Sequence, residues 1–219
     1  MPIENSTEGG ISRTLDLLLM KDLKICGEIT LPVHHCLISK SKDLKKIKNI
    51  YAHGQSLAQC HDWIANNLPN AEKITVLSNA EGAKIASKEK HSAAIASARA
   101  ASIFKLNILQ NHIEDEPNNT TRFLILSDQE IEPSGNDKTS IVVATKNKPG
   151  AIVGLIDPFA SRKVSLTKLE SRPSKIGMWE YVFFIDVDGH REDAKVKLCL
   201  ADIEKKSSFM KFLGSYPKN

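Results

Sequence analysis

Beyond residue 139 the apolar residues predict the order strand, helix, strand, strand, helix, strand, and few compact folds accommodate that order. The strands show short or alternating apolar runs, whereas the helical stretches repeat their apolar residues every three or four positions. The predicted segments cover residues 141–144, 149–160, 164–169, 181–188 and 192–204, with a last strand towards Tyr216. This βαββαβ order is the ferredoxin-like topology. Domains of that topology carry out many functions, so the order alone predicts a fold and leaves the function open.

The N-terminal part of the chain alternates short apolar runs with helical stretches, which is typical of an α/β layer architecture. Helices are expected near residues 11–20, 55–66, 80–87 and 97–104, and strands near 47–51, 74–77, 93–96 and 123–126. A further strand begins at Leu23, and its alternation predicts one shared apolar face for Leu23, Ile25, Gly27, Ile29 and Leu31. Either Ser78 or Asn79 could cap the helix at 80–87.

Residues 128–138 are the best candidate for a linker, because Pro133, Ser134, Gly135 and Asn136 follow one another in a polar stretch. A length of 219 residues leaves room for two ordinary domains. We therefore expect one domain at residues 1–127 and a second at 139–219.

Composition and charge are those of a soluble globular protein, with 41% hydrophobic and 26% charged residues. The formal net charge is only +4 and the two signs are interspersed, so we expect no nucleic-acid partner. The lysines between Lys40 and Lys48 could form a phosphate-binding patch, but the neighbouring Asp43 favours a solvated helix face. No long apolar run predicts a membrane span and no signal peptide is evident, so we expect a cytoplasmic protein with no membrane partner.

The four cysteines do not show the paired spacing of a zinc site or a redox dithiol. The run His34-His35-Cys36 could suggest a metal cluster. Neighbouring side chains on a strand point to opposite faces, however, so one metal cannot easily collect all three. We interpret them as core and surface residues, and we expect no metal and no cofactor.

The run Asn119-Thr120-Thr121-Arg122-Phe123 brings two hydroxyls and a guanidinium from a polar loop to the start of a strand. Loops held by a rigid scaffold often carry functional residues, and the donor fork of arginine suits a carboxylate. The alternative is that the threonines are ordinary strand residues and that Arg122 is a surface or salt-bridged side chain. The residues alone favour this alternative.

Four motifs that occur in a fixed order along the chain favour the functional interpretation instead. They are Pro2 to Gly9, Tyr51 to Cys60, Ala93 to Ser97 with Ala100-Ala101, and Ile113-Glu114-Asp115 followed by Asn119 to Phe123. Together they resemble the catalytic domain of prephenate dehydratase. The resemblance implies a two-lobe fold like that of periplasmic binding proteins.

The resemblance also implies the reaction and the residues of the site. Enzymes of this family convert prephenate to phenylpyruvate in L-phenylalanine biosynthesis. By resemblance, Thr121 donates a hydrogen bond to the departing hydroxyl and Arg122 clamps a carboxylate, while Glu4, Asn5, Ser6 and Gln59 line the cleft. Each also has an ordinary interpretation, since Glu4 and Ser6 could cap a turn and Gln59 could be an exposed helical residue.

The C-terminal half resembles the ACT-type regulatory domain of the same family, which binds phenylalanine. The match includes Pro149 to Ile152, Glu170 to Pro173, Trp179 to Phe183 and Leu213 to Pro217. The resemblance implies an effector site formed by Gly150, Ala151, Ile152, Glu170, Ser171, Arg172 and Pro173. Free N–H groups at a helix start can hold a carboxylate, although the glycine could instead serve only a tight turn. The resemblance further implies a homodimer or higher homo-oligomer with the ligand between subunits.

Two departures from the family pattern leave alternatives open. Ala52-His53-Gly54-Gln55 stands where many members have Ser-His-Pro-Gln, and nothing matches the family's opening Gly-Pro-x-Gly-Thr segment. We expect an incomplete first lobe that keeps residues 93–104 and 123–126, with an exposed apolar edge, poor solubility and weak activity. The chain is then a feedback-inhibited enzyme, a non-catalytic phenylalanine-binding module, or a piece of a longer sequence.

Overall fold

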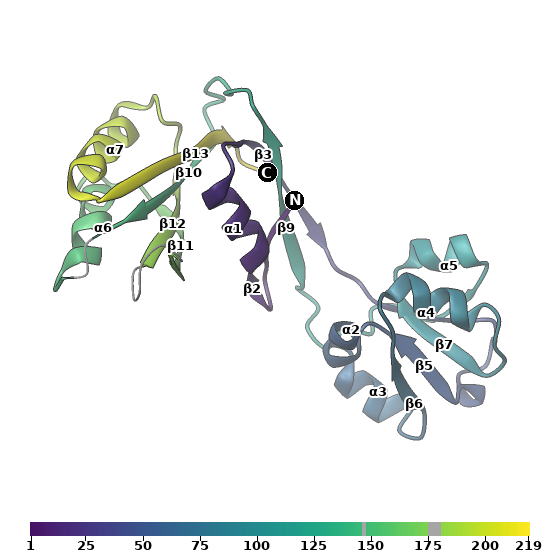
Figure 1. Ribbon diagram of the computed structural model, residues 1–219. Helices are drawn as coiled ribbons and strands as arrows, with labels where there is room; N and C mark the ends of the chain where they lie inside the picture. Colours follow the sequence, from purple (N-terminus) through teal and green to yellow (C-terminus); the bar gives the residue numbers. More distant parts are fainter. Residues whose placement is uncertain (146–147, 175–180) are drawn as a thin grey trace. The chain divides into compact units, whose positions relative to one another are not determined.

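The computed structural model describes residues 1–145, 148–174 and 181–219 (Figure 1). The chain forms two compact units. Unit 1 contains Met1–Leu31 and Thr121–Asn219, and unit 2 contains Pro32–Thr120. Among the described residues, no helix has both the length and the apolar composition needed to cross a bilayer.

Unit 2 is built on a five-stranded sheet with the order β6-β5-β7-β4-β8. Its strands are β4 (Cys36–Ser39), β5 (Asn49–Ala52), β6 (Glu72–Thr75), β7 (Ser92–Ala96) and β8 (Asn107–Gln110). Strand β5 runs parallel to β6 and β7, whereas β4 runs antiparallel to β7 and β8. All five residues of the central strand β7 are buried. The expectation that residues 93–104 belong to a lobe with 123–126 is therefore wrong, because pairing with β4 and β5 places β7 inside the sheet of unit 2.

The helices of unit 2 follow the predicted positions with one difference. They are α2 (Gly54–Gln59), α3 (His61–Asn67), α4 (Asn79–Ala86) and α5 (Ala98–Phe104), besides the short 3-10 helix η1 (Leu44–Lys46). The single helix predicted at 55–66 is two helices, because Cys60 leaves the helical conformation at φ −121° and ψ 21°. Of the two capping candidates, Ser78 caps α4: its Oγ accepts a hydrogen bond from Glu81 N at 3.1 Å.

Unit 1 contains two sheets. The first has the strand order β2-β1-β9-β3 and is accompanied by helix α1. The elements are β1 (Pro2–Asn5), β2 (Gly9–Gly10), α1 (Ser12–Met20), β3 (Lys24–Pro32) and β9 (Thr120–Ser127). Strand β9 has neighbours on both sides, so the expected open edge at 123–126 is absent from this part of the described chain. The face predicted for β3 is also wrong, since Ile25 and Glu28 are buried while Ile29 and Leu31 are exposed. Simple alternation therefore does not hold along this strand.

The second sheet of unit 1 confirms the predicted βαββαβ order. Its elements are β10 (Asp137–Ala144), α6 (Ala151–Ser161), β11 (Leu166–Pro173), β12 (Tyr181–Asp188), α7 (Ala194–Lys206) and β13 (Phe209–Pro217). The sheet order is β11-β12-β10-β13 and every pair is antiparallel. Figure 1 shows α6 and α7 over one face, where Leu155, Phe159 and Cys199 pack against the strands.

The two sheets of unit 1 share a hydrophobic core. Its buried residues are Ile3, Leu15, Leu18, Ile25, Leu124, Val142, Val182, Phe184, Leu213 and Tyr216. The first five belong to β1, α1, β3 and β9, and the rest to the second sheet. The segment 128–138 thus separates two sheets in sequence, although the apolar faces of those sheets pack together.

The close approach of the two sheets generates a stability prediction. Gly214 has φ +151°, and a Cβ added there would lie 2.2 Å from Ile25 O and 2.9 Å from Ile25 N. Gly214→Ala should therefore destabilise unit 1 by about 1–3 kcal/mol through overpacking against backbone. Urea unfolding, with hydrogen exchange followed separately in each unit, measures the change.

Gly154→Ala is the matched control, because an added Cβ in α6 meets nothing within 4 Å. That change should be neutral or stabilising by up to about 1 kcal/mol. Equal stability of the two variants would show that the contact between Gly214 and Ile25 can relax freely.

Candidate functional site

The pairing of β1 with β9 brings together four of the residues singled out in the sequence. Glu4 lies opposite Arg122 and Asn5 lies opposite Thr121 in the antiparallel register. These pairs come from positions more than 100 residues apart, so the sheet assembles a cluster that no local segment contains. Ser6 is exposed in the turn after β1.

The side chain of Asn5 fixes the orientation of the Thr121 hydroxyl. Asn5 Oδ1 accepts hydrogen bonds from Thr7 N at 3.0 Å, Thr7 Oγ1 at 2.6 Å and Glu8 N at 3.2 Å. These donors identify the oxygen of the amide, so its Nδ2 is the atom that donates to Thr121 Oγ1 at 3.0 Å. Since the Thr121 oxygen already accepts a hydrogen bond, its own proton is what it can offer to a bound molecule.

Arg122 is surrounded by carboxylates of the protein itself. Its Nη1 donates to Glu4 Oε1 at 2.6 Å, and its Nη2 donates to Asp186 Oδ2 at 2.6 Å and to Tyr216 Oη at 3.3 Å. Its Nε lies 2.8 Å from Glu28 Oε2, an ion pair that lacks hydrogen-bond alignment. The guanidinium therefore joins both sheets of unit 1.

Further charged and hydroxyl groups extend this cluster, which we call the Arg122 network. Lys138 Nζ donates to both oxygens of Glu28, at 2.8 and 2.9 Å. Lys168 Nζ contacts Glu4 Oε2 and lies 3.0 Å from Glu170 Oε2. Ser140 Oγ donates to Asp186 Oδ1 at 2.6 Å and lies 2.8 Å from Tyr216 Oη. Three cations thus face four carboxylates, and the members are Glu4, Glu28, Arg122, Lys138, Ser140, Lys168, Glu170, Asp186 and Tyr216.

Three members of the network, Glu4, Arg122 and Tyr216, have pKa values shifted from their ordinary range. Burial raises the pKa of Glu4, but the hydrogen bond from Lys168 and the charge of Arg122 outweigh it and lower the pKa overall. Burial lowers the pKa of Arg122, but Asp186, Tyr216 and Glu4 together outweigh burial and raise the pKa overall. Burial and then Asp186 raise the pKa of Tyr216, so this phenol stays neutral.

This geometry sets a condition on the predicted role of Arg122 as a carboxylate clamp. The Glu4 side chain is 29% exposed, whereas those of Glu28 and Asp186 are 4% and 7% exposed. A bound carboxylate can therefore reach the guanidinium most readily by replacing Glu4. The motifs do not single out Glu28 and Asp186, although each is an acidic residue between apolar residues of a predicted strand.

Gln59 lies in unit 2, at the end of α2. Its Oε1 lies 2.9 Å from His35 Nε2, and its backbone oxygen accepts a hydrogen bond from Asp115 N at 2.8 Å. The backbone N–H of His35 in turn donates to Glu114 Oε2 at 2.8 Å. Burial raises the pKa of Glu114, but this bond and those from neighbouring histidines lower it to about 2. Gln59 is thus half-buried and bonded, not an exposed helical residue.

The residues predicted to bind an effector lie at one end of the second sheet of unit 1. Ala144, which precedes α6, and Arg172 in β11 both pair with Val182. Gly150 forms the N-cap of α6 with φ 78°, and Ala151 and Ile152 begin the helix.

Residues Glu170 to Pro173 end β11, and their side chains alternate between the faces of the sheet. Glu170 belongs to the Arg122 network, and Arg172 donates to Ser12 Oγ at 2.6 Å and to Asp16 Oδ1 at 3.2 Å on α1. Ser171 and Pro173 are exposed. Trp179 and Glu180 of the predicted match lie outside the described residues.

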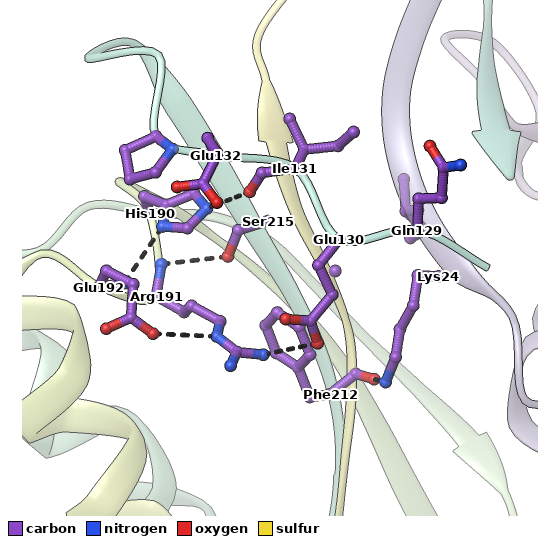
Figure 2. A pocket seen from close by; sticks show the side chains of 13 residues that line it. Lys24, Gln129, Glu130, Ile131, Glu132, His190, Arg191, Glu192, Phe212 and Ser215 are labelled. Carbon is purple, nitrogen blue, oxygen red and sulfur yellow. Dashed lines mark hydrogen bonds and ion pairs between the residues drawn. The ribbon is translucent and has the colours of Figure 1, made fainter. Parts of the chain in front are cut away.

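A separate cavity of about 300 Å³ lies beside residues 129–133 and is lined by none of the predicted site residues. Figure 2 shows Arg191 and Glu130 meeting near Phe212, with Arg191 Nη1 3.0 Å from Glu130 Oε1. The guanidinium carbon of Arg191 lies 4.8 Å from the centre of the Phe212 ring. The imidazole of His190 lies 3.0 Å from Ile131 O through Nε2. These contacts fasten the segment between the two sheets to β13 and to the turn after β12.

Comparison with known families gives two matches along the chain. A family model described as prephenate dehydratase matches residues 1–131, and one described as ACT domain matches residues 139–205.

Curated relatives are similar over nearly the whole chain. A bifunctional chorismate mutase/prephenate dehydratase of Neisseria gonorrhoeae is 48% identical over 219 residues, which cover 99% of this chain and 60% of the relative. A prephenate dehydratase of Methanocaldococcus jannaschii is 40% identical, with 99% and 80% covered. The chain thus spans about 60% of the length of the bifunctional relatives that it matches.

Solved structures of similar fold carry different descriptions. A prephenate dehydratase from Arthrobacter aurescens in complex with L-Phe has a TM-score of 0.88 at 38% identity, with 99% of this chain and 74% of that chain covered. A protein described as a novel type of quorum quenching acylase also has a TM-score of 0.88, at 29% identity, with 100% and 81% covered. Because one fold carries both descriptions, the chemistry has to be argued from the site.

The Arg122 network generates a prediction for stability. Arg122→Met should destabilise unit 1 by about 3–5 kcal/mol, because Asp186 and Glu28 would remain buried after losing a counter-charge. Arg162→Met is the control, since Arg162 pairs with Asp202 at 2.5 Å where both side chains are about one third exposed. That change should cost at most about 1 kcal/mol. Urea unfolding compares the two variants, and equal losses would contradict a special role for the buried network.

Proposed function

This chain belongs to the prephenate dehydratase family, and from that premise we propose that it converts prephenate to phenylpyruvate in L-phenylalanine biosynthesis. The observation that carries the proposal is the Thr121 hydroxyl, which accepts a hydrogen bond from Asn5 and keeps its proton available. We propose that this reaction takes place in the cytoplasm and needs no cofactor.

The chemistry requires only modest help from the protein. The bond from the ring to its carboxylate breaks, carbon dioxide leaves, and the electron pair of that bond completes the aromatic ring. At the same time the bond to the ring hydroxyl breaks, and the departing oxygen takes up a proton to become water. Aromatisation drives the change, so orientation of the substrate and a hydrogen bond to the leaving oxygen can suffice.

We propose for the individual residues the roles that the family resemblance implies, and their positions support these roles. Thr121 donates to the leaving hydroxyl, and the hydrogen bond from Asn5 holds its oxygen in place. Arg122 binds a substrate carboxylate where it now holds Glu4, the most exposed of its three carboxylate partners. Glu4 and Ser6 contribute polar groups to the remainder of the substrate site. The role predicted for Gln59, which lies in unit 2, stays a prediction.

We further propose that the second sheet of unit 1 binds L-phenylalanine as an inhibitor. The N–H groups at the start of α6, after Gly150, would hold the carboxylate of the amino acid. Ala151, Ile152 and the run Glu170, Ser171, Arg172 and Pro173 would complete the site. The exposure of Ile152 and Ser171 suits a ligand held between the subunits of a homodimer.

Thr121→Ala provides the test of the reaction. Loss of one donor to the leaving group should lower kcat by about 10²–10³-fold. Thr121→Ser keeps the hydroxyl and should retain most of the activity. Phenylpyruvate formation from prephenate measures both, and unchanged turnover in Thr121→Ala would remove this hydroxyl from the mechanism. A wild-type chain that binds phenylalanine but forms no phenylpyruvate would instead be a phenylalanine-binding module.

Gly150→Ala provides the test of effector binding, with Gly135→Ala as its control. Both glycines have positive φ, 78° and 88°, and an added Cβ at either meets nothing within 4 Å. The two changes therefore impose similar backbone strain, but only Gly150 starts α6. Calorimetry should show phenylalanine affinity lowered by at least about 10-fold in Gly150→Ala, which is about 1.4 kcal/mol, and unchanged in Gly135→Ala. Equal affinities would place the ligand elsewhere.

A further inference from the structure

Two histidines and a glutamate meet in unit 2, outside the Arg122 network. His34 Nδ1 lies 2.8 Å from Glu114 Oε1, His112 Nδ1 lies 3.2 Å from the same oxygen, and the two nitrogens are 3.2 Å apart. The imidazole rings are 4.4 Å apart, nearly perpendicular at 77°. Among the described residues, these three form a group whose potential ligand atoms all lie within 4.8 Å of one another.

The separations match those of atoms that share one metal ion. Zinc lies about 2.0–2.2 Å from nitrogen and oxygen ligands, so two such ligands are about 2.9 Å apart at 90° and about 3.3 Å apart at the tetrahedral angle. The observed separations of 2.8, 3.2 and 3.2 Å lie in or next to that range. A point about 2.1 Å from all three atoms exists, about 1.1 Å outside their plane.

Hydrogen bonds between these three side chains are less favourable than their coordination of a metal ion. To donate to Glu114, both imidazoles must carry hydrogen on Nδ1, which places two N–H groups 3.2 Å apart at one oxygen. A metal ion takes a lone pair from each of the three atoms, so all three contacts become favourable.

The surrounding protein holds the carboxylate and the second histidine in position. The other oxygen of Glu114 accepts the His35 N–H at 2.8 Å, and Ile113 N donates to His35 O at 3.0 Å. Partners of this kind orient metal ligands. The backbone of His112 has φ 51°, a conformation that residues other than glycine rarely adopt. Residues in such conformations concentrate at functional sites.

Solvent reaches the two histidines of this group. The Glu114 side chain is 2% exposed, whereas those of His34 and His112 are 45% and 65% exposed. The nearby Cys36 Sγ donates instead to Asn111 Oδ1 at 3.3 Å. Three protein ligands with an open position are the arrangement of catalytic and exchangeable metal sites.

We propose that His34, His112 and Glu114 bind one divalent transition-metal ion, Zn²⁺ or an ion with the same preference for imidazole and carboxylate. Of the adjacent histidines, His34 meets Glu114 while the side chain of His35 meets Gln59. Both lie before β4, so the strand alternation assumed from the sequence does not apply to them. The other two ligands come from residues 112–114, which lie far along the chain. The ion would join the loop after β8 to the segment before β4, next to the bond between His35 and Gln59.

The test uses the full 219-residue chain, without a polyhistidine tag and stripped of metal by a chelator. Zn²⁺ titrated by calorimetry should bind one ion per chain, and Co²⁺ should give visible absorption bands. His112→Asn should lower the affinities for Zn²⁺ and Co²⁺ by at least about 100-fold. The reason is that even residues that only hydrogen-bond to a metal ligand contribute about 10–100-fold to metal affinity. Glu114→Gln keeps an acceptor oxygen for His35 N–H and should cause a similar loss.

His91→Asn is the matched control, because His91 is also an exposed histidine with positive φ, at 61°. Asparagine tolerates that conformation, so both variants should fold. Unchanged affinity in His91→Asn together with loss in His112→Asn supports the site. Equal affinity of the wild type and His112→Asn, or no Co²⁺ bands at millimolar Co²⁺, overturns it.

Discussion

The contacts of Arg122 with three carboxylates are the interaction on which unit 1 depends. Glu4 and Glu28 come from the first sheet and Asp186 from the second, and the guanidinium reaches all three within 2.8 Å. Burying Glu28 and Asp186 without a counter-charge would cost several kcal/mol for each ion. The rigid fork of arginine can address several carboxylates at once, which the single ammonium group of lysine cannot do with the same geometry.

The same residue adjoins the proposed chemistry. Thr121 precedes Arg122 on β9, and both pair with β1. A strand that carries a catalytic hydroxyl must hold it in a fixed position, and burial of the next side chain in a network of ion pairs provides that rigidity. Lys168 and Glu170 bring β11 into the network, so the strand that ends in the proposed effector site touches the residues beside the proposed reaction site.

The sequence predicted the order and type of most elements, because periodicity reports which residues of one element are buried. Through the family resemblance it also assigned roles to Thr121 and Arg122, and these roles stay predictions. It did not predict the break at Cys60, the burial of Glu28 or the place of β7 in unit 2, since each depends on which elements become neighbours. The same limit applies to the group of His34, His112 and Glu114: two members lie about 80 residues from the first, and only the pairing of distant segments reveals them.

The shared core of unit 1 bears on how this chain can be divided. The family models end and begin on either side of residues 132–138, as if the chain were two interchangeable modules. A fragment that starts at residue 139 would instead expose Val142, Val182 and Phe184 to water and would leave Asp186 without Arg122. The C-terminal half therefore depends on the first sheet of unit 1 for part of its core and for the counter-charge of Asp186. Its transfer to another protein would have to carry β1, α1, β3 and β9 as well.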